Sequence, residues 1–364
     1  MARRGESIYL RKDGLWEARY LKEIDINGKK KYGSVYARTY REVKEKRQDA
    51  LDRILLFQKP TTIRGITVES LAQEWLAVNQ SRVKRSTLQR YQGFLKNHIG
   101  PGLGPARVAY LSTVSIHEFA QDRLKAGLSP QSVNTVLVVL HSILKYGQRQ
   151  YKLPLPEIVY LSVEKKEMRV LSPEEQKKLV AVLLEDMDAY KLGVLTALYT
   201  GLRIGELCAL RWEDIDETCI KVRKTMQRLQ KSGGEGTELF LGAPKSNSSL
   251  RAIPLPSFLR DLIFSFKNSH TTGEYFVAAP GLPITEPRVM QYKFQKYLRQ
   301  AGVDKANFHA LRHSFATRCV ECGFEIKSLS EVLGHASSRI TVDRYVHSSF
   351  ALKQANMELL SLSL

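Results

Sequence analysis

Three stretches near the start of the chain alternate apolar and polar residues, which is the pattern of half-buried β-strands. They cover residues 6–11, 15–24 and 30–37. Asp-Gly and Asn-Gly pairs separate them, and these dipeptides are typical of tight hairpin turns. From residue 39 to residue 57 the apolar residues switch to helical spacing. Residues 1–58 therefore predict an α+β domain, a three-stranded sheet with one helix packed against it.

Helical patterns dominate the next part of the chain. Apolar stripes with helical spacing run through residues 68–78, 86–99, 114–127 and 131–150. Thr67 and Ser129 stand just before two of these stripes, as helix N-caps do. The stretch 58–67 mixes Pro, Gly and Thr without periodicity and is predicted to be a linker. Residues 66–160 therefore predict an all-α bundle of helices.

The remaining residues, 168–364, predict a mainly α domain with a small antiparallel sheet. Ser172 and Glu175 form a capping box in front of its first helix. Two strand-like patterns, 219–229 and 248–256, are joined by a Gly-rich loop at 231–247, and most of the rest has helical spacing. The fold class is therefore multidomain: a sheet-plus-helix domain, a helical bundle and a mixed, mainly α domain.

The net charge of the chain indicates what kind of partner it binds. The chain has 364 residues and a formal net charge of +19. Such an excess of Lys and Arg favours a polyanionic partner, either nucleic acid or an anionic membrane surface. No apolar run reaches the length of a membrane span, the first residues lack a signal-peptide core, and the four cysteines are too scattered for a disulfide framework. We therefore expect a cytoplasmic protein with no membrane contact and with nucleic acid as its leading partner.

Both N-terminal domains carry basic residues in patterns that suit DNA. The predicted sheet interleaves basic and aromatic side chains, and its candidates for DNA contact are Arg11, Trp16, Arg19 and Tyr20. The helical bundle has its own basic cluster, formed by Arg82, Lys84, Arg85 and Arg90. Each cluster alone also matches an ordinary solvated face. Two such modules in series favour DNA.

Two histidines four residues apart, His309 and His313, share one face of a predicted helix, as the ligands of zinc proteases do. The general-base glutamate of such enzymes is replaced by Ala310, and Arg312 adjoins the second histidine, where its charge would repel a dication. No third ligand stands at a useful spacing, so we expect no metal. Arginine and histidine on one helix suit a phosphate instead, because Arg clamps two oxygens and His moves a proton.

Three other stretches contain Arg, Lys, His and Tyr residues in an order that matches a known family. "TGLRIGEL" contains Arg203 and Glu206, the predicted hairpin loop contains Lys245, and "LGH" with a following tyrosine contains His335 and Tyr345. Together with "HALRHSFAT" they resemble the tyrosine recombinase family, the lambda-integrase-like enzymes, over about residues 165–350. The helical bundle is similar to the family's core-binding domain. The N-terminal sheet resembles, less closely, the arm-binding domain of integrases from phages and conjugative transposons, and it tilts the expectation toward a transposon.

The resemblance implies a site-specific DNA recombinase that integrates and excises a mobile element without metal, ATP or any other cofactor. Tyr345 would attack a DNA phosphodiester to give a 3′-phosphotyrosine and a free 5′-hydroxyl. Arg203 and Arg312 would clamp the phosphate, and Lys245 would protonate the leaving oxygen. By the same resemblance His335 would bond a non-bridging oxygen, and His309 would accept the tyrosine proton or help to hold the phosphate.

Two further residues are expected to support the site without taking part in the chemistry. Glu206 is expected to orient its neighbours, and His313 to be structural. The chain departs from the family at Ala310, often a polar residue, and in a His335–Tyr345 gap one residue longer than in many members. These departures bear on local geometry and remove no catalytic group.

Strand exchange in the family implies partners. They are double-stranded DNA, at the element ends and the target site, and further copies of the chain in a tetramer. An excisionase and a host DNA-bending protein often assist such enzymes, which act on the bacterial nucleoid. The segment after Ser349 is apolar enough to dock on a neighbouring copy or, alternatively, to pack on its own domain. Two alternatives stay open: a type IB topoisomerase-like enzyme and a DNA-binding regulator without catalysis.

Overall fold

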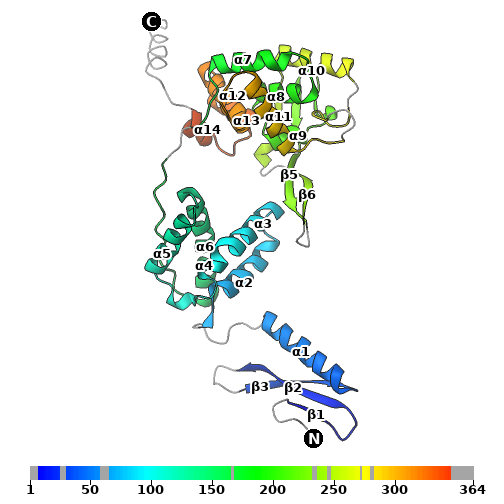
Figure 1. Ribbon diagram of the computed structural model, residues 1–364, viewed down its shortest axis with the longest axis vertical. Coiled ribbons are helices and arrows are strands. Elements are labelled where there is room, and N and C mark those ends of the chain that lie inside the picture. The colour runs from blue at the N-terminus through cyan, green and yellow to red at the C-terminus, as the bar shows by residue number, and fades with distance from the viewer. Residues whose placement is uncertain are drawn as a thin grey trace. The chain divides into compact units, whose positions relative to one another are not determined.

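The computed structural model describes residues 7–24, 30–57, 65–164, 168–231, 236–243, 247–270, 273–278 and 283–345. It divides into two units, Met1–Glu164 and Lys165–Leu364, and each is described by itself (Figure 1). The first unit contains two separate apolar cores, one under the N-terminal sheet and one inside the helical bundle. Within the described residues, no helix is both long and apolar enough to cross a lipid bilayer.

The N-terminal sheet has the three strands that the alternation predicts. Its antiparallel strands, in the order β1-β2-β3, are β1 (Ile8–Leu10), β2 (Trp16–Ile24) and β3 (Lys30–Ala37). Helix α1 (Tyr40–Phe57) packs on one face, where Ala18 and Val43 are fully buried. Successive side chains on a strand point to opposite faces. The other face of this sheet, called here the open face, therefore carries Arg19.

The helical bundle follows its predicted stripes and caps. Its helices are α2 (Val68–Gln80), α3 (Arg85–Phe94), α4 (Gly100–Leu103), α5 (Thr113–Lys125) and α6 (Pro130–Tyr151), with a short π-helix, Leu95–Ile99, after α3. Thr67 and Ser129 cap α2 and α6 as expected, each accepting a backbone N–H in the first turn. Helix α6 is the centre of the bundle, because much of its length is buried between the other helices.

The second unit is built around one buried helix. Its helices are α7 (Pro173–Leu184), α8 (Ala189–Thr200), α9 (Ile204–Cys208), α10 (Ser257–Ser269), α11 (Pro287–Gln300), α12 (His309–Glu321), α13 (Ile326–Leu333) and α14 (Ser338–Tyr345). Helix α8 is apolar on nearly all sides and lies in the main core, which explains its lack of a polar face. The predicted capping box, Ser172 with Glu175, begins α7.

The strands of this unit differ from the prediction in two respects. The pattern at 219–229 is two strands, β4 (Cys219–Val222) and β5 (Thr225–Gln230), and the predicted loop 231–247 contains a further strand, β6 (Thr237–Gly242). Strand β5 pairs with β6, while β4 pairs with β7 (Arg251–Pro254). Three of the four glycines of the loop precede residue 237, and residues 239–241 form a short apolar run, as strand residues can. The β5–β6 hairpin projects from the helical body of the unit (Figure 1).

Candidate functional site

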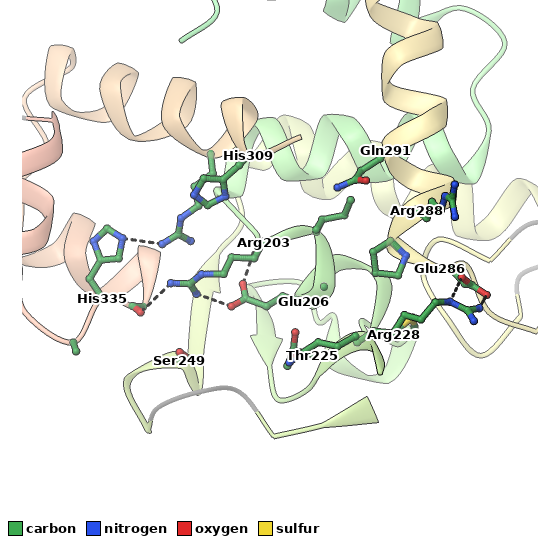
Figure 2. Close-up of a pocket in the computed structure, with 18 of the residues that line it drawn as sticks. Arg203, Glu206, Thr225, Arg228, Ser249, Glu286, Arg288, Gln291, His309 and His335 are labelled. Atoms are coloured by element: carbon green, nitrogen blue, oxygen red, sulfur yellow. Dashed lines mark hydrogen bonds and ion pairs between the residues drawn. The ribbon is translucent and has the colours of Figure 1, made fainter. Parts of the chain in front are cut away.

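A cleft of about 850 Å³ in the second unit collects most of the predicted catalytic side chains. Its walls come from α9, β5, the start of α11, α12 and the turn between α13 and α14. Figure 2 shows Arg203 and Glu206 between His309 and His335 on one side and the Arg228–Glu286 ion pair on the other. The lining is rich in cations: Arg203, Arg228, Arg288, Arg312 and Arg344.

Arg203 enters the cleft because the chain breaks between two helices. Helix α8 ends at Thr200 and is followed by Gly201, whose φ of +65° favours glycine, and Arg203 then caps α9. Glu206 ties this cap together: one carboxylate oxygen accepts from Arg203 Nη1 at 2.7 Å and the other from the Arg203 backbone N–H at 3.1 Å. Glu206 is only 4% exposed. Glu206 therefore contacts Arg203, which agrees with the expectation from the sequence that it orients its neighbours.

A second arginine, Arg251, holds the same carboxylate and was not foreseen. Its Nη1 and Nη2 donate to the two oxygens of Glu206 at 3.2 and 2.9 Å, and its side chain is 6% exposed. Burial has the largest single effect and opposes the charge of Glu206, but the hydrogen bonds and charges of Arg251 and Arg203 together outweigh it, and the pKa of Glu206 lies below its ordinary value. The only sequence signal was an arginine beginning the otherwise apolar strand β7.

Arg312 is the most deeply buried cation of the site, with 2% exposure. Its Nη1 donates to the Gly201 carbonyl at 2.8 Å and its Nη2 to the Leu333 carbonyl at 2.7 Å. Burial and then the neighbouring Arg203 charge lower the pKa of Arg312 to about 9. The guanidinium is therefore fixed in place and charged at neutral pH, before any phosphate arrives.

The end of α13 receives three guanidinium groups on three consecutive carbonyls. In chain order these pairs are Val332 with Arg251 at 2.6 Å, Leu333 with Arg312 at 2.7 Å and Gly334 with Arg203 at 3.4 Å. The last carbonyls of a helix have no partner inside it, and the helix dipole makes that end negative. The α13 terminus therefore orders Arg203 and Arg312, which line the cleft, together with Arg251, which does not.

His335 follows this terminus and is held in one tautomer. Arg312 Nη2 lies 3.0 Å from His335 Nε2, and a guanidinium can only donate, so Nε2 accepts. The proton of the neutral ring is then on Nδ1, which lies 2.9 Å from Thr341 Oγ1 and donates to it. Burial, followed by the charge of Arg312, lowers the pKa of His335 to about 3. His335 is thus a neutral acceptor for Arg312 in this structure.

Tyr345 lies next to these groups and is buried, with 6% exposure. Its hydroxyl is 2.9 Å from His313 Nδ1, and its ring is parallel to that of His335, with centroids 6.4 Å apart. Burial raises the pKa of Tyr345, although Arg312 and Arg344 oppose this. Burial also lowers the pKa of His313. The histidine that contacts the tyrosine hydroxyl is therefore His313, which the sequence suggested to be structural.

His309 lines the cleft and contacts His313, which in turn contacts Tyr345. Its ring lies edge-on to that of His313, with centroids 4.6 Å apart. Burial, followed by the charges of His313 and Arg312, lowers the pKa of His309 to about 4, so the ring is neutral at pH 7. The structure therefore brings together five of the six predicted catalytic residues. Lys245 and the tail after Ser349 lie outside the described residues.

The predicted DNA contacts of the sheet divide between its two faces. Arg11 and Arg19 are on the open face, where their guanidinium groups lie 5.3 Å from the Tyr36 ring and 5.7 Å from the Tyr9 ring. Trp16 is on the α1 side and packs against Tyr40, with ring centroids 5.1 Å apart. Tyr20 is also on that side, and its ring covers Gly33.

The candidates of the helical bundle gather around one turn. The four basic residues lie in the turn before α3 and in its first two turns: Arg82, Lys84, Arg85 and Arg90. Arg82, Lys84 and Arg90 are exposed, and the Arg90 guanidinium lies 5.5 Å from the centre of the Phe94 ring. Their placement suits contact with a phosphate backbone.

Arginines aimed into a cleft, neutral histidines and an adjacent tyrosine form a site for phosphoryl transfer. Residues 169–351 match the phage integrase family, and residues 67–124 match the N-terminal SAM-like domain of phage integrases. The chain belongs to the phage integrase family. It is a tyrosine recombinase, an enzyme of site-specific DNA recombination, as its sequence predicts.

Relatives and solved structures extend this likeness. A tyrosine recombinase XerC-like protein of Caldanaerobacter subterraneus subsp. tengcongensis is 26% identical over 358 residues, covering 89% of this chain and 90% of the relative. The Tn1549 transposon integrase bound to transposon right end DNA matches with a TM-score of 0.69 and 21% identity, over 81% of this chain and 100% of that one. A lambda integrase tetramer bound to a Holliday junction matches with a TM-score of 0.56 and 20% identity, over 91% of this chain and 96% of that one.

Proposed function

We propose that Tyr345 attacks a DNA phosphodiester and that Arg203 and Arg312 hold the phosphate during this attack. The observation that carries the proposal is the Tyr345 hydroxyl, which contacts His313 beside a cleft lined by prearranged guanidinium groups. The phosphorus–tyrosine bond forms as the bond to the 5′-oxygen breaks, leaving a 3′-phosphotyrosine. Charge on the non-bridging oxygens is stabilised by arginines that need little rearrangement.

Two histidines have separate duties in this proposal. His313 accepts the proton of Tyr345, because its Nδ1 lies within hydrogen-bond distance of the hydroxyl and its lowered pKa keeps it neutral at pH 7. His335 donates to a non-bridging oxygen after giving up its bond from Arg312, since a bound phosphate anion raises the pKa of a nearby imidazole. His309 helps to hold the phosphate from the cleft wall, and Lys245 protonates the leaving 5′-oxygen.

We further propose that the substrate is double-stranded DNA at the ends of a mobile element and at its target, and that four copies act together. The Tn1549 integrase bound to transposon DNA and the lambda integrase tetramer bound to a Holliday junction support this by their shared fold. The domains would be 1–58 for arm sites, 66–160 for core sites and 168–364 for catalysis. An excisionase and a host bending protein would set direction on the bacterial nucleoid.

Covalent trapping tests the proposed nucleophile. The protein is incubated in EDTA with a nicked duplex carrying the element's end sequence, and the products are separated under denaturing conditions. A protease-sensitive adduct is expected for the wild type and for Tyr292→Phe, a control at an exposed tyrosine of the same unit. Tyr345→Phe should give none.

The other outcomes are informative. No adduct from wild type on DNA that it binds would contradict the assignment and leave a DNA-binding regulator. An adduct with the Tyr345 variant would place the nucleophile elsewhere. Religation without exchange between two duplexes would instead favour a topoisomerase-like enzyme.

A further inference from the structure

Arg251 occupies a junction between three segments without lining the cleft. Arg251 is the first residue of strand β7. Its guanidinium donates to the carboxylate of Glu206 on α9 and, through Nε, to the Val332 carbonyl at the end of α13. It also donates to the carbonyl of Ser249 at 3.1 Å. Glu206 and Ser249 border the cleft, whereas Arg251 lies behind them. A side chain with so many fixed partners sets where those segments stand relative to one another.

Arg203 depends on this junction. Its side chain is 35% exposed, and Glu206 is its only carboxylate partner within the described residues. Glu206 faces Arg203 with the same two oxygens that accept from Arg251. If Arg251 released the carboxylate, Glu206 would keep only its bonds to Arg203 within the described residues, and the direction of the Arg203 side chain would be less fixed. An exposed arginine without such a support samples many rotamers, and ordering it again costs conformational entropy.

The glycine at the end of α13 fits the same arrangement. Gly334 has a φ of +65°, and a Cβ placed there would lie 3.1 Å from Arg251 Cδ and 3.1 Å from its Nη1. The turn that leads to His335 therefore passes directly against the Arg251 side chain. Its guanidinium fork and the bare backbone of Gly334 fit each other, which couples the position of His335 to that of Arg251.

We propose that Arg251 is a positioning residue for DNA cleavage. It holds Glu206 in the orientation that aims Arg203 at the scissile phosphate, and it fixes the α13 terminus that carries His335. The inference rests on the proposed role of Arg203. A planar fork with a third donor at Nε is required, because a lysine ammonium cannot bond both carboxylate oxygens and the Val332 carbonyl in this geometry.

The test is single-turnover cleavage of the nicked duplex at saturating protein by Arg251→Lys. We expect cleavage about 10 to 100 times slower, because a small misplacement of a catalytic group costs about that much. DNA affinity should stay within about threefold, since Arg251 does not line the cleft and its charge is kept. The control Arg169→Met breaks another Arg–Glu pair of the same unit, whose residues do not line the cleft, and should cleave at the wild-type rate.

A double-mutant cycle separates positioning from general damage. If Arg251 acts through Arg203, Arg203→Lys with Arg251→Lys should cleave about as slowly as Arg203→Lys alone, rather than showing the product of the two defects. A methylphosphonate at the scissile position carries no charge for Arg203 to neutralise. The cleavage defect of Arg251→Lys should therefore shrink on this substrate, which a defect of folding would not do.

Each contrary result has its own meaning. A wild-type rate for Arg251→Lys, multiplying defects in the cycle, or an Arg251→Lys chain that does not fold would each overturn the positioning role. If Arg203→Lys itself cleaves normally, the proposed function fails instead. The two failures are therefore distinguishable in one set of rates.

Discussion

The arginines of the cleft and those of the open sheet face are held in different ways. In the cleft, Arg312 is 2% exposed and donates to two backbone carbonyls. On the sheet, Arg19 has a side-chain exposure of 59% and rests between the Tyr9 ring and the carboxylate of Glu17. Backbone carbonyls of packed helices hardly move, whereas an aromatic face and an exposed ion pair tolerate many geometries.

The difference matches two tasks. Stabilising a transition state requires donors already in place, because reorganisation during the reaction would cost free energy. Binding a DNA backbone requires positive charge that can adjust to the phosphates it meets. The same side chain thus serves in both regions, and its surroundings decide the task. Substitutions should therefore affect rate in the cleft and affinity on the sheet.

The largest expected effect belongs to Arg312→Lys. A lysine cannot reach the Gly201 carbonyl, the Leu333 carbonyl and a phosphate together, so covalent trapping should slow by about 10²–10³. The free energy of unfolding should also fall, by about 1–3 kcal/mol, because buried carbonyls lose their donors. Rates and urea denaturation measure the two effects. A stable variant that cleaves at the wild-type rate would remove the contrast between the two regions.

The sequence predicted the elements of both regions because their patterns are local. The strand alternation, the caps at Thr67 and Ser172, and the helix with two histidines are all visible within a few residues. Strand β6 was missed because the glycines before it suggested a loop throughout, while its pairing with β5 depends on burial that a local pattern does not contain.

The contacts inside the site were beyond the sequence for a related reason. Arg251 stands 45 residues after Glu206, and only the packing of β7 against α9 and α13 brings them together. His313 and Tyr345 are 32 residues apart. Motif spacing told us which residues share a helix, but not which of two histidines on α12 points at a tyrosine on α14. Alternation alone separates Arg19 from Trp16 onto opposite sheet faces, although both were predicted from the sequence as DNA contacts.

A smaller effect is expected on the pH dependence of stability, and it concerns the buried groups of the cleft. The folded pKa values of His309 and His335, about 4 and about 3, lie below the unfolded value of about 6.5. Between pH 6.5 and 4 the unfolded chain therefore binds protons that the folded chain does not, and the unfolding free energy falls as pH falls. For His335 the ideal loss at pH 5 is about 2 kcal/mol, which its contact with cleft water reduces to about 1 kcal/mol.

Thermal unfolding at pH 7 and pH 5 measures this loss. A decrease of about 1 kcal/mol corresponds to about 2–4 °C in Tm for a domain of this size. His335→Gln should flatten the pH dependence, whereas His117→Gln in the helical bundle should leave it unchanged. A pH dependence that survives His335→Gln in full would mean that other groups cause it.

The smallest effects are expected on the open sheet face, where single charges act almost independently. Replacing Arg19 by Gln removes one exposed cation and should weaken binding to arm-site DNA only a few-fold. The slope of log affinity against log salt concentration should decrease by about 1, and cleavage of nicked core DNA should be unchanged. Arg41→Gln is the matched control, since it removes an arginine that is 90% exposed on α1, the other side of the sheet. If both variants lower the salt slope equally, DNA does not prefer the open face. If Arg19→Gln slows cleavage at saturating DNA, the sheet takes part in catalysis and the division of labour between adjustable and fixed arginines is wrong.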